Sequence, residues 1–153
     1  MVVKKYPKHK IPDSLYSYLD MCQKAENIPG YNHVFGKGDF FYHPDIGIST
    51  VDINLGEGSF YCTEQNLFDK KLFAGECTWL PSKKQLKELI KKINPAQNSL
   101  SSFLGDKSGN SGYPKGIKPK SLFKKTEERR LAYYMFVKHN MTWSKENKKW
   151  IQI

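Results

Sequence analysis

The sequence has few of the features that mark secreted proteins, membrane-spanning proteins or proteins that recognise specific bases of nucleic acid. Its three cysteines are odd in number and follow no spacing pattern, which predicts reduced thiols in a cytoplasmic protein. No apolar run approaches the roughly 18 residues of a membrane-spanning helix, and residues 1–7 lack the apolar stretch of a signal peptide. Arginine is scarce, with two residues against 23 lysines. Because arginine is the residue that usually recognises bases and phosphates through paired hydrogen bonds, this scarcity argues against sequence-specific binding of nucleic acid.

Positive charge is abundant, and it is divided by region. The whole chain carries a net charge of +10. Residues 1–10 contain four lysines, whereas residues 11–80 contain ten acids and four lysines, a net charge of −6. Residues 81–153 contain 17 lysines and arginines and five acids, a net charge of +12. Basic charge concentrated in one part of a chain attracts polyanions. The sequence therefore predicts a binding protein with a basic C-terminal half.

The length and the hydrophobic pattern predict one α+β domain over residues 1–153, with no membrane segment. Aromatic residues make up 14% of the chain, which favours a packed core and excludes a disordered chain. We expect a small antiparallel sheet of three to five strands with an N-terminal helix and two C-terminal helices. Helices are predicted at about 14–25, at 82–93 and from 126 onward. Strands are predicted at 39–42, 47–53, 59–63, 77–80, 141–143 and 149–151.

Two segments are predicted to lack regular structure. Residues 1–11 are a basic, flexible lead-in. Residues 96–120 form a long basic loop rich in glycine, serine and lysine, and a loop of this length is either functional or mobile. The glycines of residues 105–116 could bring backbone N–H groups close to an anion. Their spacing differs from that of a nucleotide-binding phosphate loop, so a solvent-exposed loop is the alternative.

The basic residues from 107 to 130 are the predicted contact with nucleic acid. Lysines bind phosphates by releasing counterions, and an interleaved aromatic ring can stack on an exposed base. The same lysines are also compatible with a solvated face that only keeps the protein soluble. The predicted binding residues are Lys107, Tyr113, Lys115, Lys118, Lys120, Lys124, Lys125, Arg129 and Arg130.

Aromatic residues on two predicted strands form a second candidate surface. Residues 40–42 and 60–61 are all aromatic, and neighbours in a strand face opposite sides of the sheet. One member of each pair is therefore expected to point outward, unless helices cover both faces. An exposed aromatic row would bind a protein or stack on bases. The predicted protein-binding residues are Tyr42 and Tyr61.

Signatures of catalysis and of metal binding are weak. Among His33, His43, Cys62 and Cys77, no two residues lie within four positions of each other, whereas structural zinc sites use closely spaced pairs. We therefore predict no metal and no other cofactor. A small hydrolase or nuclease could use His43 with Glu64, or with Cys62, but no known catalytic motif is present. Enzymatic activity is the less favoured hypothesis, and no catalytic residue is assigned.

Two stretches resemble uncharacterised small bacteriophage accessory proteins. Residues 78–86, T-W-L-P-S-K-K-Q-L, follow the pattern T-W-L-P-x-x-x-Q-L. Residues 127–135, E-E-R-R-L-A-Y-Y-M, followed by Trp143 and Trp150, are similar to the ending of the same proteins. The matched positions are mainly helix starts and core residues. The resemblance therefore implies a phage or prophage origin and carries over no catalytic residue.

Three hypotheses about function follow. The leading one is a phage-type accessory protein in the host cytoplasm that binds RNA or DNA backbone, or a host complex that handles nucleic acid. The alternative is an inhibitor that binds a protein of a host defence system, as anti-CRISPR proteins do, through exposed strand aromatics. The third is the small hydrolase or nuclease.

Overall fold

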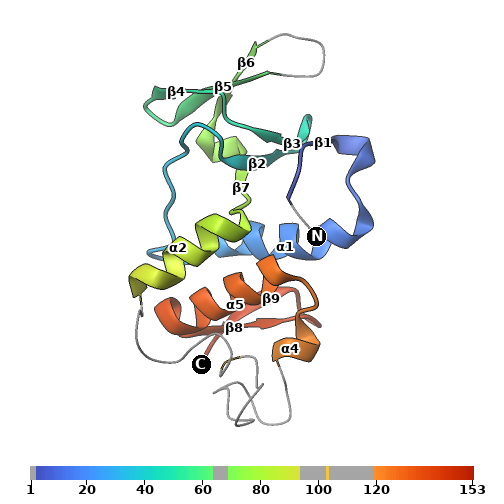
Figure 1. Cartoon of the computed structure of the whole chain (residues 1–153), viewed down its shortest axis with the longest axis vertical. Coiled ribbons are helices and arrows are strands. Elements are labelled where there is room, and N and C mark those ends of the chain that lie inside the picture. The colour runs from blue at the N-terminus through green and yellow to red at the C-terminus, as the bar shows by residue number, and fades with distance from the viewer. Residues whose placement is uncertain (1–2, 64–68, 94–102, 104–118) are drawn as a thin grey trace. The chain divides into compact units, whose positions relative to one another are not determined.

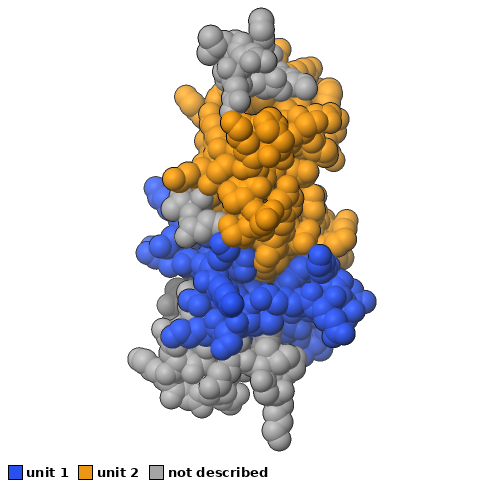
Figure 2. Space-filling model, turned by 90° about the vertical axis from the view of Figure 1, so that its right-hand side faces the viewer, with its two compact units in different colours: residues 1, 83–153 blue, residues 2–82 orange. Residues whose placement is uncertain are grey.

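The computed structural model describes residues 3–63, 69–93, 103 and 119–153. The chain divides into two compact units (Figure 2). We call residues 2–82 the N-terminal unit and residues 83–153 the C-terminal unit. The predicted α+β class is confirmed, because the described residues form four α-helices and antiparallel sheets of four, three and two strands (Figure 1). None of the described helices is long and apolar enough to cross a membrane.

The N-terminal unit combines one helix with two small sheets. The strand order is β1-β3-β2-β7 in the four-stranded sheet and β4-β5-β6 in the three-stranded sheet. The elements are α1 (Asp13–Ala25), β1 (Tyr6–Pro7), β2 (Phe40–His43), β3 (Gly47–Thr50), β4 (Ile53–Gly56), β5 (Ser59–Thr63), β6 (Asp69–Phe73) and β7 (Thr78–Trp79), with short 3₁₀ turns at Lys8–Lys10 and Ala74–Glu76.

Helix α1 forms where the apolar period predicts it. Leu15, Leu19 and Cys22 recur at helical spacing, and all three are buried. Tyr18 is also fully buried, and its hydroxyl donates a hydrogen bond of 2.7 Å to the carbonyl of Pro81. That bond satisfies a buried polar group and ties the helix to the segment that follows β7.

The strand predicted over residues 47–53 is two strands that belong to different sheets. The break lies at Val51 and Asp52, where the backbone changes partner. The amide of Val51 donates to the carbonyl of Asp39 at 2.9 Å, and the amide of Asp52 donates to the carbonyl of Tyr61 at 2.8 Å. The turn at Gly56–Gly58 then joins β4 to β5, as the glycines predict.

Aromatic side chains alternate across the strands as expected. Phe41 and Phe60 are almost completely buried, and their ring centroids lie 5.0 Å apart in an edge-to-face arrangement. Phe35 completes the cluster, with its centroid 5.1 Å from that of Phe60. Tyr42 and Tyr61, which follow Phe41 and Phe60 in sequence, are half-buried. One ring of each pair therefore packs in the core, and the other reaches the surface.

The basic lead-in is packed where the sequence predicts a flexible segment. Tyr6–Pro7 forms an edge strand on β3, in register with Ile48 and Gly47. Val3, before this strand in the sequence, and Ile11, after it, are both buried. Two isolated apolar residues and a two-residue strand are too short a pattern to recognise in a sequence, but together they hold the segment on the sheet.

The C-terminal unit contains three described helices and a hairpin. These are α2 (Lys83–Ile93), α4 (Pro119–Leu122), α5 (Thr126–His139), β8 (Met141–Ser144) and β9 (Lys149–Gln152). Helices α2 and α5 pack side by side (Figure 1).

Helix α5 passes directly into the hairpin. The helix ends at His139, and the next residue, Asn140, caps it with a left-handed backbone (φ 57°). In the hairpin, Trp143 faces Trp150 with ring centroids 5.1 Å apart. Of the predicted 96–120 loop, only Phe103 and residues 119–120 are described. Phe103 is buried, with its ring 5.2 Å from that of Tyr133 on α5.

Candidate functional site

Helix α2 carries a row of exposed lysines. The helical period separates them from its apolar side, where Leu86 is fully buried. Lys83, Lys87 and Lys91 follow each other at every fourth residue and therefore lie along one line. Glu88 is the single acid of the helix. The exposed lysines of α2 are Lys83, Lys84, Lys87, Lys91 and Lys92.

No described acid forms an ion pair with these lysines. Within the part of the chain that the structure describes, none of the five has a carboxylate at ion-pairing distance. Glu127 and Glu128, in the first turn of α5, are buried, with 1% and 3% of their surface exposed. Two of the five acids of the basic half are thus withdrawn from the surface, which leaves α2 strongly positive.

The predicted nucleic-acid-binding residues fall into two groups. Lys107, Tyr113, Lys115 and Lys118 lie outside the described residues. The other five lie on α4, on the segment after it and on α5. Lys120 and Lys124 are exposed, whereas Lys125, Arg129 and Arg130 are half-buried.

Both arginines donate hydrogen bonds to backbone carbonyls. Arg129 donates from Nε to the carbonyl of Phe123 at 2.5 Å and from Nη2 to that of Lys120 at 3.2 Å. Arg130 donates from Nη1 to the carbonyl of Lys83 at 3.2 Å. The arginines therefore connect the start of α5 to two basic segments, Arg130 to the first residue of α2 and Arg129 to α4. Both predicted phosphate contacts thus also have a structural role in the C-terminal unit.

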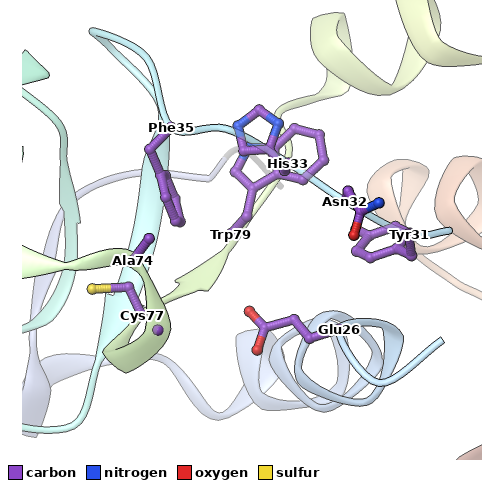
Figure 3. A pocket seen from close by; sticks show the side chains of 9 residues that line it. Glu26, Tyr31, Asn32, His33, Phe35, Ala74, Cys77 and Trp79 are labelled. Atoms are coloured by element: carbon purple, nitrogen blue, oxygen red, sulfur yellow. The ribbon is translucent and has the colours of Figure 1, made fainter. Parts of the chain in front are cut away.

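A pocket of about 310 Å³ opens in the N-terminal unit (Figure 3). Its walls come from the end of α1, the segment before β2 and the chain around β7. In Figure 3 the carboxylate of Glu26 points into the space below Trp79, with Cys77 and Ala74 on the opposite side. The lining includes Glu26, Tyr31, His33, Phe35, Cys77 and Trp79.

His33 is held firmly in the wall of this pocket. Its Nε2 lies 2.7 Å from Oδ2 of Asp39, which also accepts a hydrogen bond of 2.8 Å from the amide of Gly36. The imidazole stacks on the indole of Trp79, with centroids 3.5 Å apart and planes within 6°. A side chain fixed by both a carboxylate and a stacked ring gives the pocket a preorganised wall.

Burial changes the acid–base properties of two groups at the pocket. Desolvation raises the pKa of the Glu26 carboxyl, against the lowering effect of hydrogen bonds from the Trp79 backbone and the Thr78 side chain. Desolvation, together with the nearby Glu76, Cys62 and Glu26, raises the pKa of the Cys77 thiol to about 12. Cys77 is therefore protonated at neutral pH and is a poor nucleophile.

The structure describes two of the three residues considered for catalysis. His43 is buried, and its Nδ1 accepts a hydrogen bond of 3.1 Å from the amide of Asp45. Cys62 is fully buried, and Glu64 lies outside the described residues. Among the described residues, His33 pairs with the carboxylate of Asp39. No group of three metal-ligating side chains occurs among the described residues.

Glu26→Gln is expected to remove part of the pH dependence of folding. The folded state holds the proton of Glu26 more tightly than the unfolded state, in which the pKa is near its ordinary value of 4.5. This carboxyl therefore lowers the free energy of unfolding as pH rises from about 4.5 through its folded-state pKa. Urea denaturation of both proteins across pH 4–8 measures the difference. Parallel pH profiles for the two proteins would show that Glu26 does not titrate in this way.

Sequence inspection recognised neither the lysine row of α2 nor the pocket as a site. The helical period contains the signal for the lysine row, since it places five lysines opposite a leucine stripe. No comparable signal exists for the pocket, because Trp79 lies 46 positions after His33 in the chain. Comparison with protein-family models, with curated proteins and with solved structures gives no match.

Proposed function

We propose that the protein binds the phosphate backbone of nucleic acid through its C-terminal unit, as a phage-type accessory protein in the host cytoplasm. The observation that carries this proposal is the row of exposed lysines on α2, which have no carboxylate partner among the described residues. The phage origin is supported by the resemblance of two sequence stretches. The cytoplasmic location is supported by the three cysteines, which are free thiols.

The length and charge of the row suit a polyanion. From Lys83 to Lys91 the helix rises roughly 12 Å, and duplex DNA presents roughly seven phosphate charges over that length. Lys120 and Lys124, which are also exposed, extend the positive surface near the start of α5. Lysine is a flexible point charge, so the surface favours the backbone over any particular base.

A salt titration of binding tests this function. If about four lysines each neutralise one phosphate, the logarithm of the association constant falls with the logarithm of salt concentration at a slope of about −3.6 for duplex DNA. Between about 50 and 200 mM salt the affinity should then drop roughly 100-fold. Fluorescence anisotropy with labelled DNA and RNA, as duplexes and as single strands, measures the slope. An absence of binding at low salt, or an association constant that does not change with salt concentration, would rule out the electrostatic mechanism.

A second candidate function is docking to a host protein, and one surface favours it. On the sheet β4-β5-β6, Ile53, Leu55 and Phe73 are 54%, 42% and 52% exposed. Strand alternation and register place the half-buried Tyr61 on the same face, opposite Ile53 and Lys71. Exposed apolar residues gathered on one face are typical of protein-binding sites. Tyr42, the other predicted contact, lies on the separate sheet β1-β3-β2-β7.

A further inference from the structure

We propose that the pocket of the N-terminal unit binds a small organic cation of the alkylammonium class. This site is distinct from the basic surface of the C-terminal unit, and it has the opposite electrostatic character. Three properties carry the proposal: negative charge at the pocket, aromatic walls and a volume suited to a small ligand.

The negative charge comes from Glu26 and Glu76, neither of which forms an ion pair with another described residue. Glu26 points into the pocket (Figure 3), and its known partners are hydrogen-bond donors, the Trp79 backbone and the Thr78 side chain. Glu76 lies close enough to act electrostatically on Cys77 in the pocket wall. His33, the basic group in the lining, is already paired with Asp39. A bound cation would therefore meet a carboxylate that no described residue neutralises, on a side chain that solvent reaches.

Aromatic rings form a large part of the pocket wall. Tyr31, Phe35 and Trp79 line it, and the rings of Tyr31 and Trp79 lie 6.4 Å apart at an angle of 38°. Aromatic rings attract organic cations through their negative faces and also bury the attached alkyl groups. Since His33 covers one face of Trp79, the ring is locked in position before any ligand binds.

The size and the donor groups favour an organic cation over a metal ion or a large ligand. A volume of about 310 Å³ is at the lower limit of small-molecule sites, which span roughly 300–1,000 Å³. The described residues offer no cluster of three metal-ligating side chains. An ammonium group on a short alkyl chain satisfies the carboxylate with its charge and the rings with its carbon atoms.

NMR titration of the full chain with n-butylammonium tests the proposal, with n-butanol as a neutral ligand of the same shape. The reporter is the indole N–H signal of Trp79, and the signals of Trp143 and Trp150 in the other unit serve as internal controls. We expect a saturable shift of Trp79 alone at millimolar n-butylammonium, and at least tenfold weaker binding of n-butanol. Equal binding of the two ligands, or no shift of Trp79, would overturn the proposal.

Variants assign the charge to its residue. Glu26→Gln keeps the shape of the side chain and should weaken n-butylammonium at least tenfold, whereas Glu146→Gln, at an exposed acid of the hairpin turn, should have no effect. Unchanged binding to Glu26→Gln would refute the assignment. Lysine amide that is acetylated at Nα carries the same ammonium group on its side chain. Tighter binding of that amide would identify the ligand as a lysine side chain of a partner, and tighter binding of n-butylammonium would identify it as a free amine.

Discussion

Replacing Lys84, Lys87 and Lys91 together with glutamine is expected to weaken the binding of duplex DNA by roughly 10²- to 10³-fold near 0.1 M salt. Each lysine that releases one counterion contributes about one unit to the salt slope, so the slope should fall by nearly three. Glutamine has a helix propensity close to that of lysine, and the three side chains are exposed. The helix should therefore remain folded, and circular dichroism can verify it alongside the anisotropy titration.

A matched variant separates the α2 surface from the overall charge of the protein. Lys138, Lys145 and Lys149 are also exposed and lie at the end of α5 and on the hairpin. Changing these three to glutamine removes the same charge, but it should cost at most a few-fold in affinity. An equal loss of affinity in both variants would mean that binding depends on the overall positive charge of the protein and not on a site at α2. A host complex that survives both variants and is lost in Tyr61→Ala would indicate the protein-docking surface of β4-β5-β6.

Gly47→Ala is expected to lower the free energy of unfolding of the N-terminal unit by about 2–5 kcal/mol. Gly47 has a positive φ of 98°, which side chains of L-residues rarely adopt. A Cβ at this position would also collide with the backbone of β1, lying only 2.6 Å from the carbonyl carbon of Pro7. Urea denaturation measures the loss, and hydrogen exchange at residues 6–10 shows whether β1 detaches first.

Gly38→Ala provides the control for this effect. Gly38 has a similar φ of 89°, but nothing lies within 4 Å of the position where its Cβ would be. This variant therefore incurs only the backbone strain, about 1–2 kcal/mol. The difference between the two variants isolates the steric contact with β1. Equal destabilisation would mean that the contact between β1 and β3 contributes nothing to the stability of the fold.

The elements that could be predicted are those whose contacts join residues close together in the sequence. Helices α1, α2 and α5 occur within one or two residues of their predicted ranges, because the apolar period and the end signals of a helix are local. The hairpin of β8 and β9 was also recognised from short apolar runs around a polar turn. The division of residues 47–53 between two sheets could not be predicted in this way. It depends on the amides of Val51 and Asp52, which donate to the carbonyls of Asp39 and Tyr61, about ten positions away in opposite directions.

The sequence by itself determined the α+β class, the three long helices, the alternation of the strand aromatics and the concentration of basic charge after residue 80. These follow from periodicity and composition, which need no knowledge of distant neighbours. Only the tertiary structure decided that β1 packs on β3, that the arginines bind backbone carbonyls, and that Glu26, His33 and Trp79 line one pocket. The packing of β1, the bond from Arg130 to Lys83 and the pocket each bring together residues about 40 or more positions apart. A local pattern contains no information about such contacts.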